Sequence, residues 1–247
     1  MPLDISRIQV LCFDIDGTLS DTDDRYVYLL SRWLSLVRWL FPRHDPHPFA
    51  RWLAMAVESP ANFVYSALDW IGLDALFQKL RCFLSSHLAR LGWGFRPPIF
   101  WLLPSARPML EYLSQRYPLA IVSARDLAAT LAFLDQFQLS GFFRTIAHSQ
   151  TCLHTKPFPD PIQWVARELG VPVENCLMIG DTTVDIRSGK AAGAQTVGVL
   201  CGFGTEAELK RAGADLILPS TIDLANWLVV PDQPVSVNLA ELERETS

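Results

Sequence analysis

Six short apolar segments recur along this chain, and most of them are separated by stretches with the periodicity of a helix. Apolar strands that alternate with helices are typical of a parallel sheet with helices on both faces. The sequence therefore predicts an α/β fold with a doubly wound parallel sheet, in which ligands bind at the carboxyl ends of the strands. The expected strands are residues 8–13, 119–123, 144–147, 176–179, 195–200 and 215–218. The expected helices are residues 106–116, 126–138, 159–170, 183–192 and 205–213.

The first expected strand stands apart from the others, because a long helical and aromatic block follows it. Residues 21–104 hold six of the eight tryptophans, and their net charge is +2 against −7 for the remainder of the chain. The clearest helical spacing of apolar residues in this block lies in residues 26–41. We therefore expect an α/β core over residues 1–20 and 105–230, and an inserted α-helical cap over residues 21–104. A polar tail should occupy residues 231–247.

The composition excludes several classes of protein. Half of the 247 residues are apolar and 19% are charged, which is too apolar for a disordered chain. The net charge of −5 argues against a general nucleic-acid binder, and no apolar run reaches the roughly 18 residues of a membrane-spanning helix. The five cysteines are scattered, and the first residues lack the pattern of a secretory signal. We therefore expect a cytoplasmic protein with reduced thiols, no nucleic-acid partner and no integral membrane contact.

An acidic motif, DIDGT, directly follows the first expected strand. Its two carboxylates, Asp14 and Asp16, are two residues apart where the strand ends, so both can face one cleft, and Gly17 permits a sharp turn. One carboxylate could attack a phosphorus atom as a nucleophile, and the other could serve as general acid and then as general base. The alternative is that the Asp-Gly pair is ordinary turn chemistry after a strand.

A second acidic motif, GDTTVD, follows the strand expected at residues 176–179. Asp181 and Asp185 are four residues apart at the start of a helix, so they can lie on one side of its first turn. Acidic residues are also common at helix starts, and this motif alone would favour that structural interpretation. Together with the first motif it predicts a Mg²⁺ site, because oxygen ligands from Asp14 and Asp181, with water, suit this hard cation.

Two further residues complete a candidate phosphate site. Ser123 ends the strand expected from residue 119, and a hydroxyl beside the N–H groups of a helix start suits a phosphoryl oxygen, although a helix cap is the alternative. Lys156 lies in a proline-rich segment that would hold its charge in a fixed place. The alternative for a single lysine is a solvated surface residue.

The four segments, in this order and spacing, resemble the haloacid dehalogenase-like superfamily of hydrolases. The resemblance covers residues 6–20 and 104–228, and it includes the segment AAGAQTVGV at residues 191–199. The insertion after the first motif is similar to the helical cap of the phosphoglycolate-phosphatase-like branch. This resemblance implies a Rossmann-like catalytic core, a helical cap that chooses the substrate, and Mg²⁺ as cofactor.

The resemblance also implies roles for the first motif and for the lysine. Asp14 corresponds to the nucleophile that becomes an aspartyl phosphate. Asp16 corresponds to the general acid and base, and its main-chain carbonyl would join the metal shell. Lys156 corresponds to the lysine that steadies the nucleophile and the transferring phosphoryl group.

The remaining roles concern phosphate and metal binding. Ser123 corresponds to the hydroxyl that binds the phosphoryl group, Asp181 to the acidic metal ligand, and Asp185 to its supporting acid. The residue after the hydroxyl is often Asn in the family, whereas Ala124 stands here. Only a main-chain N–H could therefore contribute at that position.

The predicted function is hydrolysis of a small organic phosphate ester, with phosphoglycolate as the first substrate to test. Asp16 argues against a dehalogenase, because dehalogenases and phosphonate-cleaving relatives usually lack this acid. Two alternatives stay open: a phosphosugar mutase, and a binding protein that has lost activity on the same fold. The apolar face of residues 26–41 could also cover a membrane or a partner, although packing on the core explains it more simply. The sequence leaves the oligomeric state open.

Overall fold

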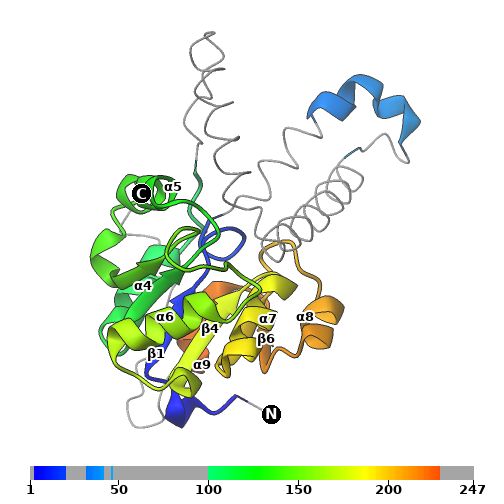
Figure 1. Ribbon diagram of the computed structural model, residues 1–247. Helices are drawn as coiled ribbons and strands as arrows, with labels where there is room; N and C mark the ends of the chain where they lie inside the picture. The colour runs from blue at the N-terminus through cyan, green and yellow to red at the C-terminus, as the bar shows by residue number, and fades with distance from the viewer. Residues whose placement is uncertain (1–2, 21–31, 42–45, 47–99, 229–247) are drawn as a thin grey trace.

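The computed structural model describes residues 3–20, 32–41, 46 and 100–228 (Figure 1). Most of the predicted cap and the whole of the predicted polar tail lie outside these residues. The described part nevertheless includes both segments that we assigned to the α/β core, up to Leu228.

A six-stranded parallel sheet forms the centre of the described structure (Figure 1). The strand order is β3-β2-β1-β4-β5-β6, and every adjacent pair is parallel. Each strand coincides with an apolar segment found in the sequence, so the predicted α/β fold with a parallel sheet is confirmed. The strands are β1 (Val10–Phe13), β2 (Leu119–Val122), β3 (Phe143–Ala147), β4 (Cys176–Gly180), β5 (Gln195–Val199) and β6 (Leu216–Leu218).

Helices cover both faces of this sheet. Side chains of α4, α5 and α9 join one buried cluster, and side chains of α6 and α7 join the cluster on the other face. The described α-helices are α4 (Ala106–Ser114), α5 (Leu127–Gln136), α6 (Asp160–Leu169), α7 (Thr183–Ala192), α8 (Glu206–Ala212) and α9 (Leu224–Trp227). Short 3-10 helices are η1 (Ile5–Arg7), η2 (Ser35–Leu40), η4 (Ser140–Phe142), η5 (Val173–Asn175) and η6 (Thr221–Asp223).

Strand β1 lies in the middle of the sheet and is buried on both sides. Leu11 and Phe13 belong to the cluster on the α4 and α5 face, whereas Val10 and Cys12 belong to the cluster on the α6 face. Burying a large apolar side chain contributes about 1.5–3 kcal/mol, so the unbroken apolar run of β1 favours this central position. The first polar side chain after the run is Asp14, at the carboxyl end of the strand.

The connections between strands reverse direction at the centre of the sheet. From β1 the chain proceeds outward through β2 to β3, and it then returns through α6 to β4 on the other side of β1. In open α/β sheets the crevice outside the carboxyl ends of the two strands at such a reversal is where ligands bind. The fold therefore points to the carboxyl ends of β1 and β4.

The chain leaves the described core near Ser20 and rejoins it at Phe100, and the two ends of the intervening segment are joined beside β1. Ser20 and Leu102 form an antiparallel bridge, and the Leu103 N–H donates to the Leu19 carbonyl at 2.9 Å. Phe100 and Leu103 are buried. These contacts hold residues 100–103 next to the first acidic motif.

The predicted helix over residues 26–41 is described only from residue 32. Residues 32–34 are α-helical as predicted, Ser35–Leu40 is a 3-10 helix, and Phe41 is extended before a proline, as steric contact with a proline ring favours. Trp33, which we expected on the packed face, is 73% exposed. From Ser35 onward the helix has three residues per turn, so apolar residues at α-helical spacing do not stay on one face there.

Two findings bear on the predicted cellular setting. Within the described ranges, no helix is both long and apolar enough to cross a membrane. The four cysteines in those ranges, Cys12, Cys152, Cys176 and Cys201, are free. A cytoplasmic location stays a prediction.

Candidate active site

The two acidic motifs meet because β1 and β4 are neighbours. Phe13 pairs with Ile179, and the Asp14 N–H donates to the Ile179 carbonyl at 3.0 Å. Asp14 is the residue after β1, and Asp181 is the residue after β4. Two carboxylates far apart in the sequence therefore leave adjacent strand ends into the same crevice.

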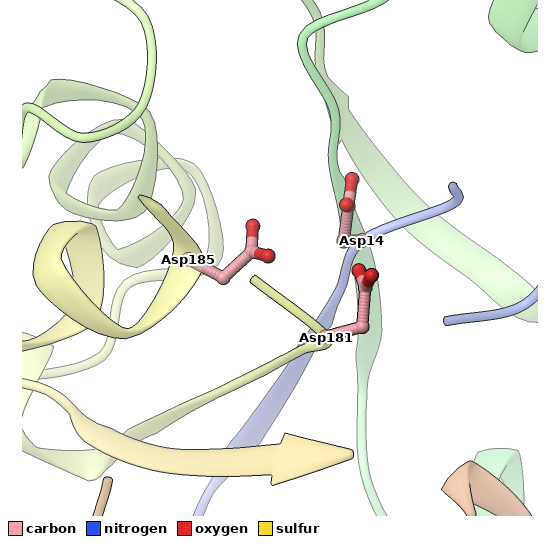
Figure 2. Close-up of side chains that lie close together, drawn as sticks. All are labelled: Asp14, Asp181 and Asp185. Atoms are coloured by element: carbon pink, nitrogen blue, oxygen red, sulfur yellow. The ribbon is translucent and has the colours of Figure 1, made fainter. Parts of the chain in front are cut away.

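Three buried carboxylates gather there (Figure 2). One carboxylate oxygen from each of Asp14, Asp181 and Asp185 lies within 4.8 Å of the others. Asp14 and Asp181 come from the strand ends, and Asp185 points toward them from the first turn of α7 (Figure 2). The structure thus places these three acids side by side, and their role as metal ligands stays a prediction.

Lys156 joins the cluster from the loop before α6. Its Nζ lies 2.8 Å from Asp14 Oδ1 and 2.6 Å from Asp185 Oδ1, and its side chain is almost fully buried. The loop is tied to α7, because the Ser188 hydroxyl donates to the Phe158 carbonyl at 2.7 Å. Lys156 is therefore a buried ion-pair partner of two acids and not a solvated surface residue.

The burial of these charges shifts their proton affinities. Burial raises the pKa of Asp14 to about 7, and the charges of Asp185 and Asp16 add to this effect, while Lys156 opposes it. Burial alone would lower the pKa of Lys156, but Asp14 and Asp185 outweigh it and raise that pKa above its ordinary value. Lys156 is thus protonated, and its single positive charge does not neutralise all three carboxylates.

The carboxylate of Asp181 is held by a main-chain and a side-chain donor. Its Oδ2 accepts from the Phe203 N–H at 2.9 Å, and its Oδ1 accepts from the Thr18 hydroxyl at 3.3 Å. Two glycines make room for it, because a Cβ on Gly17 would lie 2.3 Å, and a Cβ on Gly202 2.1 Å, from Asp181 Oδ2. Gly17 also has a φ of +68°, a conformation that other residues resist.

Asp185 is fixed by the start of its own helix. Its Oδ2 accepts from the Thr182 N–H at 3.1 Å and from the Thr182 hydroxyl at 2.7 Å, which is one half of a capping box. Its Oδ1 accepts from Lys156. The structural interpretation of this acid is therefore correct, because one oxygen caps α7, while the other oxygen bonds to Lys156 and its role in metal binding stays a prediction.

The donor set suits a divalent hard cation. All three acids offer oxygen, and three carboxylates with one ammonium group leave net negative charge in a buried place. Mg²⁺ is bound through few carboxylates and several waters, which this arrangement allows. The Asp16 side chain is not part of this cluster; the expectation for its main-chain carbonyl stays a prediction.

Ser123 lies at the same edge of the sheet, after β2. Because Ile121 pairs with Phe13, the carboxyl end of β2 is beside that of β1. Ser123 is buried, its N–H donates to the Ala147 carbonyl at 2.9 Å, and its hydroxyl oxygen accepts from the Arg125 N–H at 3.2 Å. Ala124 is exposed.

Comparison with known proteins matches part of this chain to a known family. The sequence pattern of the family described as "Haloacid dehalogenase-like hydrolase" matches residues 99–199. Residues 99–199 therefore resemble a haloacid dehalogenase-like hydrolase domain. Curated relatives include pyrophosphatase PpaX of Bacillus pumilus, 27% identical over 89% of this chain and 95% of that protein. Another is phosphoglycolate phosphatase of Aliivibrio fischeri, 26% identical over 85% of this chain and 92% of that protein.

Solved structures share the fold at low sequence identity. A haloacid dehalogenase-like family protein from Streptococcus pneumoniae is 21% identical, with a TM-score of 0.61, and the match covers 91% of this chain and 100% of that one. A protein from Thermotoga maritima whose name includes beta-phosphoglucomutase is 20% identical, with a TM-score of 0.60, over 90% and 98% of the two chains. These likenesses concern the haloacid dehalogenase-like fold.

Several residues of this candidate site were missed in the sequence. Arg125 forms an ion pair with Asp16, and Thr18, Gly202 and Phe203 surround Asp181. A signal for Gly202 existed, since a Gly-x-Gly segment follows β5 at the carboxyl edge of the sheet. Arg125 had a weaker signal, a basic residue two positions after a serine at a strand end.

We expect Gly202→Ala to disturb metal binding while the fold persists. The new Cβ would overlap the carboxylate of Asp181 and push it out of the cluster. The rise in Tm caused by Mg²⁺ should then be much smaller than in the unchanged protein. Gly141→Ala is the matched control, because a Cβ there meets nothing within 4 Å. Equal Mg²⁺ shifts in both variants would contradict this role of Gly202.

The raised pKa of Asp14 predicts a pH-dependent difference in stability between the unchanged protein and Asp14→Asn. In the metal-free folded protein this carboxyl has a pKa of about 7, against an ordinary value of 3.8, so folded Asp14 holds its proton more tightly. Its contribution to stability is therefore present below pH 4 and is lost as the pH rises through about 7.

Asp14→Asn should consequently gain stability relative to the unchanged protein as the pH rises from about 4 to about 7, by at most about 1.4 kcal/mol per pH unit, and the difference should level off above that range. Urea unfolding in EDTA at several pH values measures this difference. A difference that stays constant with pH would show that burial does not penalise the ionised form of Asp14.

Proposed function

We propose that this protein is a Mg²⁺-dependent phosphatase that hydrolyses a small organic phosphomonoester through an aspartyl-phosphate intermediate on Asp14. The observation that carries the proposal is the buried Asp14 carboxylate, which Lys156 holds beside Asp181 and Asp185 at the strand ends. A buried nucleophile, a fixed cation and a set of oxygen ligands in one crevice are what phosphoryl transfer to a carboxylate needs.

The first requirement is to offset repulsion between a phosphate dianion and a carboxylate nucleophile. Asp14, Asp181 and Asp185 would hold Mg²⁺, which when bound neutralises charge on the phosphoryl oxygens. Lys156 contributes a fixed positive charge 2.8 Å from Asp14 Oδ1, so it orients the nucleophile as well as attracting the substrate. The Ser123 hydroxyl, at the neighbouring strand end, would donate to a phosphoryl oxygen.

The second requirement is proton transfer, which we assign to Asp16. A carboxylate oxygen of Asp14 forms a bond to phosphorus, the bond from phosphorus to the ester oxygen breaks, and Asp16 donates a proton to that oxygen. Water then attacks the phosphorus of the aspartyl phosphate, Asp16 accepts a proton from this water, and inorganic phosphate leaves with Asp14 regenerated. Asp16 is suited to this exchange because its side chain is 35% exposed, at the edge of the buried cluster.

The substrate is proposed on two grounds. Curated relatives carry the names phosphoglycolate phosphatase and pyrophosphatase PpaX, so phosphoglycolate is the first substrate to test, with pyrophosphate beside it. We further propose, from the sequence, that residues 21–104 form the cap that selects the substrate. Their +2 charge would attract an anion.

Two alternatives have distinct consequences. A phosphosugar mutase would convert a hexose 1-phosphate into the 6-phosphate instead of releasing phosphate, and the neighbour from Thermotoga maritima keeps this option open. A binding protein on this fold would release no phosphate from any ester. Product analysis after incubation with a hexose 1-phosphate separates the mutase from the phosphatase.

Phosphate release from p-nitrophenyl phosphate should require Mg²⁺ and disappear in EDTA. Asp14→Asn should lower turnover by more than about 10³-fold, because no other described side chain occupies the position of the nucleophile. Asp135→Asn is the matched control, since Asp135 bonds to the Ser140 hydroxyl on the surface. Near-native turnover of Asp14→Asn would reject Asp14 as nucleophile, and inactivity of the unchanged protein on a panel of esters would favour the binding protein.

A further inference from the structure

Arg125 reaches from the loop after β2 to the carboxylate of Asp16. Its Nε donates to Asp16 Oδ2 at 2.7 Å, and its Nη2 donates to Asp16 Oδ1. Two parallel hydrogen bonds from a planar guanidinium fix the direction and the rotation of a carboxylate, which a single bond does not. Asp16 therefore has a defined orientation in spite of its partial exposure.

The guanidinium of Arg125 is itself held in place. It lies over the Phe100 ring, 4.7 Å from the centroid, and near the Phe133 ring, 5.6 Å from its centroid. The main chain is fixed as well, because the Arg125 N–H donates to the Ser123 hydroxyl and its carbonyl accepts from the Ser149 N–H at 2.9 Å. Arg125 is thus anchored at both ends, with its side chain 14% exposed.

A contribution to the stability of the fold does not explain why Arg125 is paired with Asp16. Nη1 of Arg125 is buried and has no hydrogen-bond partner among the described residues. A buried donor without a partner is costly, and replacing a buried ion pair by apolar side chains is often neutral or stabilising. Asp16 is exposed enough to be hydrated without the arginine. A residue that adds little stability at this place is better explained by a function.

On the basis of the phosphatase function proposed above, we propose that Arg125 is a positioning residue for Asp16, and that it sets the orientation in which Asp16 exchanges protons. The orientation persists through the reaction: when Oδ1 carries the proton, Oδ2 still accepts from Nε. Phe100, which packs on the guanidinium, is where the chain rejoins the core after the insertion.

The test compares kcat/KM, which reports on transfer to Asp14, for two esters that differ in leaving group. An alkyl phosphate needs a proton from Asp16, whereas p-nitrophenolate leaves with little help. Arg125→Met should lower kcat/KM about 10–100-fold for the alkyl ester and less than about fivefold for p-nitrophenyl phosphate. Arg125→Lys, which can donate to only one oxygen, should recover part of the loss, and Tm should stay within a few degrees.

Arg107→Met is the matched control. Arg107 also lies over an aromatic ring, Phe142, and donates to the carbonyls of Phe137 and Gln138, but on the outside of α4. Arg107→Met should leave kcat/KM for both esters unchanged. A non-specific effect of removing an arginine from an aromatic ring would instead lower kcat/KM in both arginine variants.

A double-mutant cycle with Asp16→Asn gives the sharpest result, because residues that act as a unit are not additive. In that background Arg125→Met should cause no further loss. Equal losses for the two esters, or a full additional loss in the Asp16→Asn background, would overturn the role of Arg125. Inactivity of the unchanged protein would instead overturn the phosphatase itself, and the inference with it.

Discussion

Three buried carboxylates lie close together with one buried lysine at the carboxyl ends of β1 and β4, and the rest of the site is arranged around this imbalance of charge. An ionised carboxylate away from water is costly unless it is paired or hydrogen-bonded. Lys156 pairs with two of the acids, and the Phe203 N–H and the Thr18 hydroxyl support the third. The remaining negative charge has no structural benefit, which is typical of a place built to receive a cation.

The fold brings these charged groups together with little irregular backbone structure. β1 and β4 are buried, regular strands, and the chain bends sharply only after them, at Gly17 and at the start of α7. Asp185 shows how one side chain serves two purposes, since one oxygen caps α7 and the other bonds to Lys156. The helix start therefore fixes the direction of a charged group without an additional loop.

Arg125 fixes the direction of a further carboxylate, that of Asp16, at the edge of the site. The side chain is held in one orientation by its ion pair with Asp16 and by its contacts with Phe100 and Phe133. Its Nη1 has no hydrogen-bond partner among the described residues. Rigid support of this kind is what acid–base catalysis needs, since small errors in geometry are costly in rate.

The sequence by itself determined the alternation of strands and helices and the residues at the strand ends. The reason is local: unbroken apolar runs identify buried strands, and polar residues that directly follow them, such as Asp14, Ser123 and Asp181, must lie at one edge of a parallel sheet. Local patterns were less reliable at residues 35–40, where α-helical spacing did not predict the 3-10 helix Ser35–Leu40. Only the tertiary structure decided that β1 lies between β2 and β4, that Arg125 binds Asp16, and that Gly202 makes room for Asp181. These contacts join residues far apart in the chain, and they depend on strand order and side-chain packing, which no local pattern encodes.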